Sequence, residues 1–111
     1  MLHVRDLLDL VAYQAAGIDR LNGNTFNVGG GVENSVSLLE LTDLCREVTG
    51  NTLKIGAEPE ERPADIPYYV TDNTAVCRAC GWTPGRNLTT IASDTAQWMH
   101  DNRDVLRSVL G

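Results

Sequence analysis

Residues 26–41, "FNVGGGVENSVSLLEL", most constrain what this chain can fold into. An apolar run ends at three consecutive glycines, and a helix start follows a few residues later. Ser37 and Glu40 have the spacing of a capping box, in which each side chain can accept a hydrogen bond from the other residue's backbone N–H. The stretch therefore predicts a short buried strand over 25–30 and a helix that begins at Ser37, with Gly50 placed to end it.

Apolar periodicity predicts a helix over residues 4–16, with Gly17 as its stop. A helix buries residues at i, i+3, i+4 and i+7, and the expected buried face is Val4, Leu7, Leu8, Val11 and Ala15. For the helix that starts at Ser37, the expected face is Leu38, Leu41, Leu44, Cys45 and Val48.

The second half of the chain predicts another short strand over 51–57 and an aspartate-started helix within 71–82 that ends at Gly81. A last helix follows "TPGRN", with Ile91, Thr95, Trp98, Met99, Leu106 and Val109 largely on one side. Alternating helices and strands predict an α/β fold with a small, mostly parallel sheet, in one small domain over residues 1–111. Parallel sheets need cover on both faces, so we expect the chain to be part of something larger.

Composition excludes several classes of partner. Nine Lys and Arg against fifteen Asp and Glu give a net charge of −6, and the basic residues are scattered, which argues against nucleic acid. No apolar run has the roughly 18–20 residues of a membrane span. The first residues lack the features of a signal peptide, so we expect a cytoplasmic protein without a membrane partner. Three cysteines in such a chain favour reduced thiols.

The glycine run is a poor match to a dinucleotide fingerprint. Gly29 and Gly31 fit the first two positions of G-x-G-x-x-G, but the third falls on Asn34, and the helix opens later, at Ser37. Glycines after a strand also serve tight turns that need a positive φ. The structural interpretation is favoured, and we expect no cofactor-binding residue here.

The cysteines and histidines give weak signals for a metal or redox centre. Cys77 and Cys80 form "CRAC" near the end of a predicted helix, whereas a redox pair lies at a helix start. Zinc would need two further ligands, and Cys45, His3 and His100 do not have ligand spacing. We expect the CRAC cysteines to pack as small apolar side chains, and the two histidines to lie at the surface or to cap helices. A zinc or redox centre is the weaker alternative.

The segment "ERPADIPYY" is the best candidate binding site. Arg62 and Asp65 lie on a proline-rich loop that is followed by Tyr68 and Tyr69. A guanidinium matches the geometry of a diphosphate, and a nearby carboxylate can accept hydrogen bonds from ribose hydroxyls. A surface salt bridge on a stiff loop explains the same pair equally well.

Four segments, "HVRDLLDLV", "TFNVGGGVENSVSLLEL", "RPADIPYYVTDN" and "CGWTP", together resemble a known family. Their order and spacing are similar to the C-terminal part of extended short-chain dehydrogenase/reductases, which are NAD-dependent nucleotide-sugar epimerases and dehydratases. The glycine segment most resembles the CDP-paratose 2-epimerase (CDP-tyvelose epimerase) branch. The resemblance implies the substrate-side part of an extended Rossmann-type fold, with the "FNVGG" strand at an edge of the sheet, away from the cofactor loop.

By this resemblance, Arg62 contacts the nucleotide diphosphate, Asp65 lies near the ribose and Tyr69 lines the substrate side. The family's NAD fingerprint and its Tyr-x-x-x-Lys pair are missing, since Lys54 is the single lysine and Gly50 stands four residues before it. We therefore expect no catalytic residue, no cofactor bound by this chain alone, and no activity alone, although NAD is implied for the full-length family.

The expected function is that of a C-terminal substrate-binding segment of a nucleotide-sugar epimerase, with a nucleotide sugar or nucleoside diphosphate as its ligand. The alternative is a free-standing nucleotide-binding or self-associating module without an enzymatic role. An exposed edge of the predicted sheet predicts a homo-oligomer.

Overall fold

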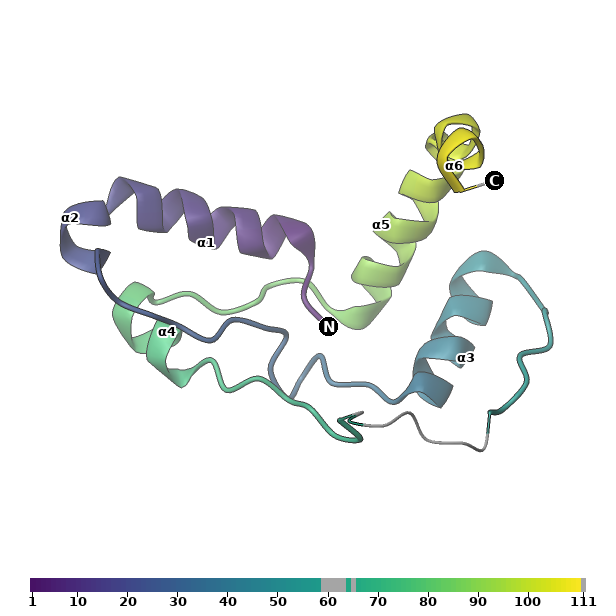
Figure 1. Cartoon of the computed structure of the whole chain (residues 1–111), viewed down its shortest axis with the longest axis horizontal. Helices are drawn as coiled ribbons and strands as arrows, with labels where there is room; N and C mark the ends of the chain where they lie inside the picture. Colours follow the sequence, from purple (N-terminus) through teal and green to yellow (C-terminus); the bar gives the residue numbers. More distant parts are fainter. Residues whose placement is uncertain (59–63, 65, 111) are drawn as a thin grey trace.

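A computed structural model describes residues 1–58, 64 and 66–110, and this part of the chain is helical (Figure 1). The longest helix has 14 residues, and no helix within the described residues combines the length and apolar character needed to cross a membrane. In chain order the helices are α1 (Val4–Ala16), α2 (Ile18–Leu21), α3 (Leu38–Thr49), α4 (Thr74–Cys80), α5 (Leu88–Asp101) and α6 (Arg103–Leu110).

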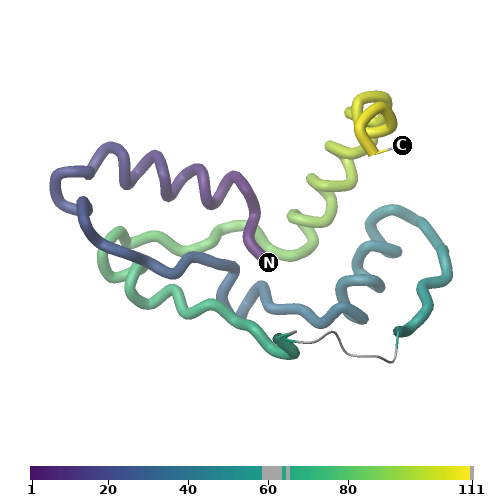
Figure 2. The backbone as a smooth tube through the Cα atoms, viewed as in Figure 1, coloured from purple at the N-terminus to yellow at the C-terminus, as the bar shows by residue number. Residues whose placement is uncertain are grey.

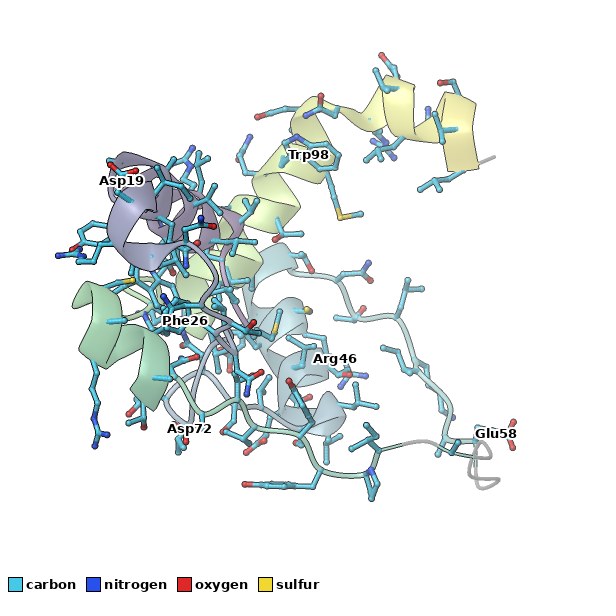
Figure 3. The ribbon with its side chains drawn as sticks, turned by 60° about the vertical axis from the view of Figure 1, so that its left-hand side comes forward. Asp19, Phe26, Arg46, Glu58, Asp72 and Trp98 are labelled. Atoms are coloured by element: carbon cyan, nitrogen blue, oxygen red, sulfur yellow. The ribbon has the colours of Figure 1, made fainter. Side chains whose placement is uncertain are left out.

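The helices form two lobes (Figures 1 and 2). In the first lobe, α1 packs against α2 and α4, and in the second, α3 packs against α5, which leads into α6. The first lobe holds the main apolar core, around which Phe26 and Trp82 pack, and Figure 3 shows Phe26 among the side chains of this lobe. The buried residues of this core are Leu10, Leu21, Val76 and Cys80.

The molecule is open for its size. Its radius of gyration is 17.2 Å, whereas a compact chain of this length has about 13 Å. Its solvent-accessible surface is 8968 Å², whereas a compact protein of 12.1 kDa exposes about 6,000 Å². Roughly 3,000 Å² of surface is therefore exposed beyond what a compact fold leaves open.

The predicted α/β fold with a parallel sheet is wrong for the described residues, which contain no strand. A strand exists only where its backbone pairs with another strand. In the first predicted strand, 25–30, Gly29 instead bonds through both backbone groups to the side chain of Asn73. In the second, 51–57, the N–H of Leu53 donates to the side chain of Asn51. Without a ladder there is also no sheet edge, so this structure gives no support to oligomerisation through one.

The helix over residues 4–16 was predicted with the correct bounds but the wrong buried face. Asp6 and Leu10 are buried, and Leu10 enters the core. The expected face lies in solvent, with exposed fractions of 73% for Val4, 63% for Leu8 and 50% for Val11. The apolar stripe of α1 thus faces away from the other described residues.

The local helix signals are confirmed. Ser37 and Glu40 form the capping box at the start of α3, and Gly50 and Gly81 end α3 and α4 in the left-handed conformation. The single last helix was wrong. Asn102 breaks it into α5 and α6, and its side chain donates to the carbonyl of Trp98 at 2.9 Å. Of the predicted apolar side, Ile91 is buried, but Trp98, Met99 and Val109 are exposed.

The expected face of α3 is only partly covered, and α2 was not predicted. Leu41, Leu44 and Val48 are half-buried, while Leu38 is 85% exposed. No residue of α3 is fully buried. The second lobe therefore has little core of its own.

A polar cluster joins the start of α1 to the loop before α5. Asp6 is buried, with 3% of the residue exposed, and its carboxylate accepts hydrogen bonds from the guanidinium and the backbone N–H of Arg86. Its backbone carbonyl accepts from the indole N–H of Trp82 at 3.0 Å. Asn34 is also buried and donates to the carbonyl of Arg86 at 2.9 Å. Arg86 therefore connects three segments that are distant in sequence.

Replacing Asp6 by Ala should lower the free energy of unfolding by about 3 kcal/mol, because it leaves the Arg86 groups without their buried partner. This value is at the lower end for a buried pair, since the Arg86 side chain is 31% exposed. Asp9 contacts the same guanidinium at 3.3 Å but is 64% exposed, so Asp9→Ala should cost less than about 0.5 kcal/mol. Urea denaturation measures both, and equal losses would contradict this account.

Stability at acid pH should depend on the capping box. The Glu40 carboxylate accepts hydrogen bonds from the hydroxyl and from the backbone N–H of Ser37. These bonds, of which the hydroxyl has the larger effect, lower the pKa of Glu40 below its ordinary 4.5. Because the folded pKa is lowered, this stabilisation is present above pH 4.5 and is lost as the pH falls through the folded pKa. In Ser37→Ala, an NMR titration should show a higher pKa for Glu40, while Thr49→Ala leaves it unchanged. An unaltered titration in Ser37→Ala would refute the coupling.

Candidate functional site

Of the three predicted substrate-side residues, Tyr69 lies within the described part of the chain, and Arg62 and Asp65 lie outside it. Tyr69 is 75% exposed and lines a hollow of about 260 Å³. Gly29–Gly31 and Ser35 line the same hollow. The structure thus brings Tyr69 to the glycine segment, a neighbourhood that the sequence did not indicate.

The three glycines each have a steric reason. A Cβ on Gly29 would overlap the side chain of Thr71, and one on Gly30 would overlap the carbonyl of Met1. Gly31 has a φ of +70°, the left-handed conformation that favours glycine. Gly29 and Gly30 are therefore required by close packing, and Gly31 by a turn, which supports the structural interpretation of this segment.

The described residues do not fit the nucleotide phosphates of NAD. The room that the first two glycines would leave for phosphate is filled by Thr71 and Met1. At the start of α3, the N–H groups of Ser37 and Glu40 are engaged by the capping box of the helix itself. A second hollow of about 500 Å³ beside the glycines is lined by Glu33 and Asp72, carboxylates that would repel phosphate. Arg86 also lines it, but its guanidinium is already paired with Asp6 and Asp9.

Asp72 and Asn73 fix the entry of the chain into α4. The Asp72 carboxylate accepts from the hydroxyl and the N–H of Thr74 at 2.6 and 2.9 Å, which lowers the pKa of Asp72. The Asn73 amide accepts from the N–H of Gly29 at 3.0 Å and donates to its carbonyl at 2.9 Å. The segment that carries Tyr69 is thus held at its C-terminal end by Asp72 and Asn73 through these hydrogen bonds.

Upstream of Tyr69, Ala64 stands between the two undescribed site residues and has a φ of +66°. This conformation costs a non-glycine residue about 1–3 kcal/mol, and such strain gathers at ligand-binding loops. The strained position is consistent with a binding role for the loop.

His3 is the N-cap of α1, as the capping prediction expected, and it is 6% exposed. Its Nδ1 accepts from the N–H of Arg5 at 3.0 Å, so the proton of the neutral ring is on Nε2, which lies 3.2 Å from the carboxylate of Asp94. Neither nitrogen is left to act as a base, although the ring borders a hollow of about 510 Å³.

The CRAC pair packs as expected, with Cys80 buried in the core and Cys77 half-buried. Cys77 is the middle residue of α4 and Cys80 is its last, whereas a redox pair lies at a helix start. Cys45 is exposed on α3. Among the described residues, no three His, Cys, Asp or Glu side chains are grouped closely enough to hold a metal ion.

Comparison with known proteins shows what the chain is similar to. No protein-family model matches it. CDP-paratose 2-epimerase of Salmonella typhi is 32% identical over 101 residues, which cover 91% of this chain and 28% of that protein. GDP-L-fucose synthase 1 of Arabidopsis thaliana is 33% identical over 102 residues, again 91% of this chain and 29% of that protein. A putative GDP-L-fucose synthase 2 of the same plant matches to the same degree over 104 residues.

The match lies in the C-terminal part of these proteins. The resemblance to the C-terminal segment of a nucleotide-sugar epimerase is confirmed. The chain spans less than a third of the length of each of these relatives. Its similarity therefore concerns one segment of such an enzyme.

Proposed function

We propose that this chain forms the nucleotide-binding side of a nucleotide-sugar epimerase, and that the loop from Arg62 to Tyr69 holds the nucleoside diphosphate. One observation carries the proposal: 91% of the chain matches the C-terminal part of proteins named for CDP-linked and GDP-linked sugars. Arg62 would bind the diphosphate through paired N–H groups, Asp65 would accept from the ribose, and Tyr69 would offer an aromatic surface.

The hollow at Tyr69 supports a shared site rather than a complete one. Its volume of about 260 Å³ is below the roughly 300–1,000 Å³ of typical ligand pockets. Tyr68 and Tyr69 are both largely exposed, with fractions of 82% and 75%. A nucleotide bound here would touch this chain on one side, and another part of the enzyme would cover its other side.

This chain would bind and orient the substrate without changing it. In the resembled family, NAD supplies the oxidation of a sugar carbon and the return of hydride. The described residues do not fit that cofactor, and Lys54 is exposed and lacks the tyrosine partner of the family's catalytic pair. Catalysis therefore requires residues from outside this chain.

Titration of the chain with CDP, GDP, UDP and NAD by calorimetry should give binding of at least one nucleoside diphosphate and none of NAD. Arg62→Ala should weaken that binding tenfold or more, because a charge-assisted hydrogen bond contributes about 1.5–3 kcal/mol. Tyr69→Ala should weaken it less, through the loss of stacking area.

Arg107→Ala is the matched control, since Arg107 is exposed on α6, lines neither hollow at the glycines and should leave affinity unchanged. A loss of affinity equal to that of Arg62→Ala would mean that net charge, and no defined site, governs binding. Absence of heat with all four compounds would refute the nucleotide-binding role.

A second function, association with another surface, is favoured by the apolar stripe of α1. Leu8 and Val11 are exposed on it, and Val4 continues it toward the start of the helix. Exposed apolar patches of this kind mark contact surfaces. In the proposed enzyme the stripe would be covered by the remainder of the protein, and in the isolated chain it would drive self-association.

Sedimentation velocity over a range of concentrations should show self-association of the chain, and Leu8→Glu with Val11→Glu should abolish it, because charges on the stripe lose the apolar contact. Ile55→Glu, at a residue that is 65% exposed elsewhere, is the control and should associate as the original chain does. A chain that stays monomeric at all concentrations would show that the stripe does not bind a second copy.

A further inference from the structure

The amide of Asn73 occupies both backbone groups of Gly29, although the two residues are 44 positions apart. The N–H of Gly29 donates to Oδ1 and the carbonyl accepts from Nδ2, at 3.0 and 2.9 Å. Gly29 is itself buried. A carboxamide is suited to this role because it carries a donor and an acceptor side by side. Asn73 thus holds the glycine segment as a neighbouring strand would.

Asn73 adjoins a helix that is buried in the apolar core of the first lobe. It is the N-cap residue of α4, which is anchored by the fully buried Val76 and by Cys80. Buried core residues of this kind open last during local fluctuations. The contact with Gly29 therefore fixes the glycine segment to the core of the first lobe.

The same contact sets the path of the chain that leads to Tyr69. Thr71, two residues before Asn73, lies directly against Gly29. Tyr69, Thr71 and the glycines all line the 260 Å³ hollow. Because Tyr69 is largely exposed, its own packing contributes little to holding this segment, and the anchor at Asn73 and Thr71 supplies the constraint.

We propose that Asn73 is a positioning residue for nucleotide binding, which holds residues 69–71 against the glycine segment so that Tyr69 faces the ligand. The inference rests on the proposed nucleotide-binding function. Asn73 does not line the hollow at Tyr69, so it acts through the segment that it holds. If residues 69–71 are ordered before the nucleotide binds, the entropy cost of ordering them in the complex is avoided. Loss of the contact between Asn73 and Gly29 therefore weakens affinity.

The test compares Asn73→Ala and Asn73→Asp with Asn102→Ala, a control that also removes one side-chain bond to a backbone carbonyl. Amide hydrogen exchange of Gly29 and calorimetric affinity for the nucleoside diphosphate that the original chain binds are both measured. Asn73→Ala should expose the Gly29 amide and weaken binding roughly tenfold, because residues 69–71 would then have to be ordered when the ligand binds. Asn102→Ala should change neither.

Asn73→Asp separates positioning from general stability. Aspartate keeps an acceptor for the Gly29 N–H but places a carboxylate oxygen against the Gly29 carbonyl in place of the donor, so exchange protection and affinity should both fall below those of the original chain. If Asn73→Ala does not fold, Asn73→Asp carries the test. Full affinity in a variant whose Gly29 amide exchanges freely would overturn the positioning role and leave the proposed function intact. An original chain that binds no nucleotide would overturn both.

Discussion

The arrangement of this chain depends on the interaction between the buried carboxylate of Asp6 and Arg86. The main apolar core lies in the first lobe, and α3 contributes no fully buried residue. The lobes are related by the polar cluster, in which Asp6 binds Arg86 and the Arg86 carbonyl accepts from Asn34, and by the contact of His3 with Asp94. A buried carboxylate cannot slide along its partner as apolar surfaces can, because each lost hydrogen bond leaves a desolvated group. The cluster therefore sets the position of the loop before α5 relative to α1.

Sequence patterns predicted those features that depend on neighbouring residues alone. The capping box at Ser37 and the left-handed glycines Gly50 and Gly81 satisfy N–H and carbonyl groups within their own helix turns, and all were confirmed. The bounds of α1 follow from the same local rules. The buried face of α1 does not follow from these rules. An apolar stripe indicates that a helix packs against something, but it does not indicate where the packing surface lies. The described residues provide cover for Leu10 but not for Leu8.

The prediction of a sheet was wrong because strand pairing depends on residues that are distant in sequence. A strand needs a partner strand, and the residue that satisfies Gly29 is an asparagine 44 positions away, which no periodicity reveals. The same distance concealed the approach of Tyr69 to the glycines. Arg62 and Asp65 remain predictions from sequence, since they lie outside the described residues. The sequence predicted correctly that the glycine run is structural, but it did not predict that Thr71 packs against Gly29.

The exposed surface of the chain and the proposed binding loop lead to the same inference, which is that further protein covers this chain. Roughly 3,000 Å² is exposed beyond a compact fold, which is more than the roughly 1,000–2,500 Å² that each partner buries in an obligate interface. A nucleotide is far too small to cover this area, so a ligand alone cannot make the fold compact. Tyr69 and the stripe of α1 are both exposed, and protein that covered the proposed binding loop would also exclude water from it. Charge-assisted bonds strengthen when water is excluded, so under the proposed function the isolated chain would bind nucleotide more weakly than the assembled site.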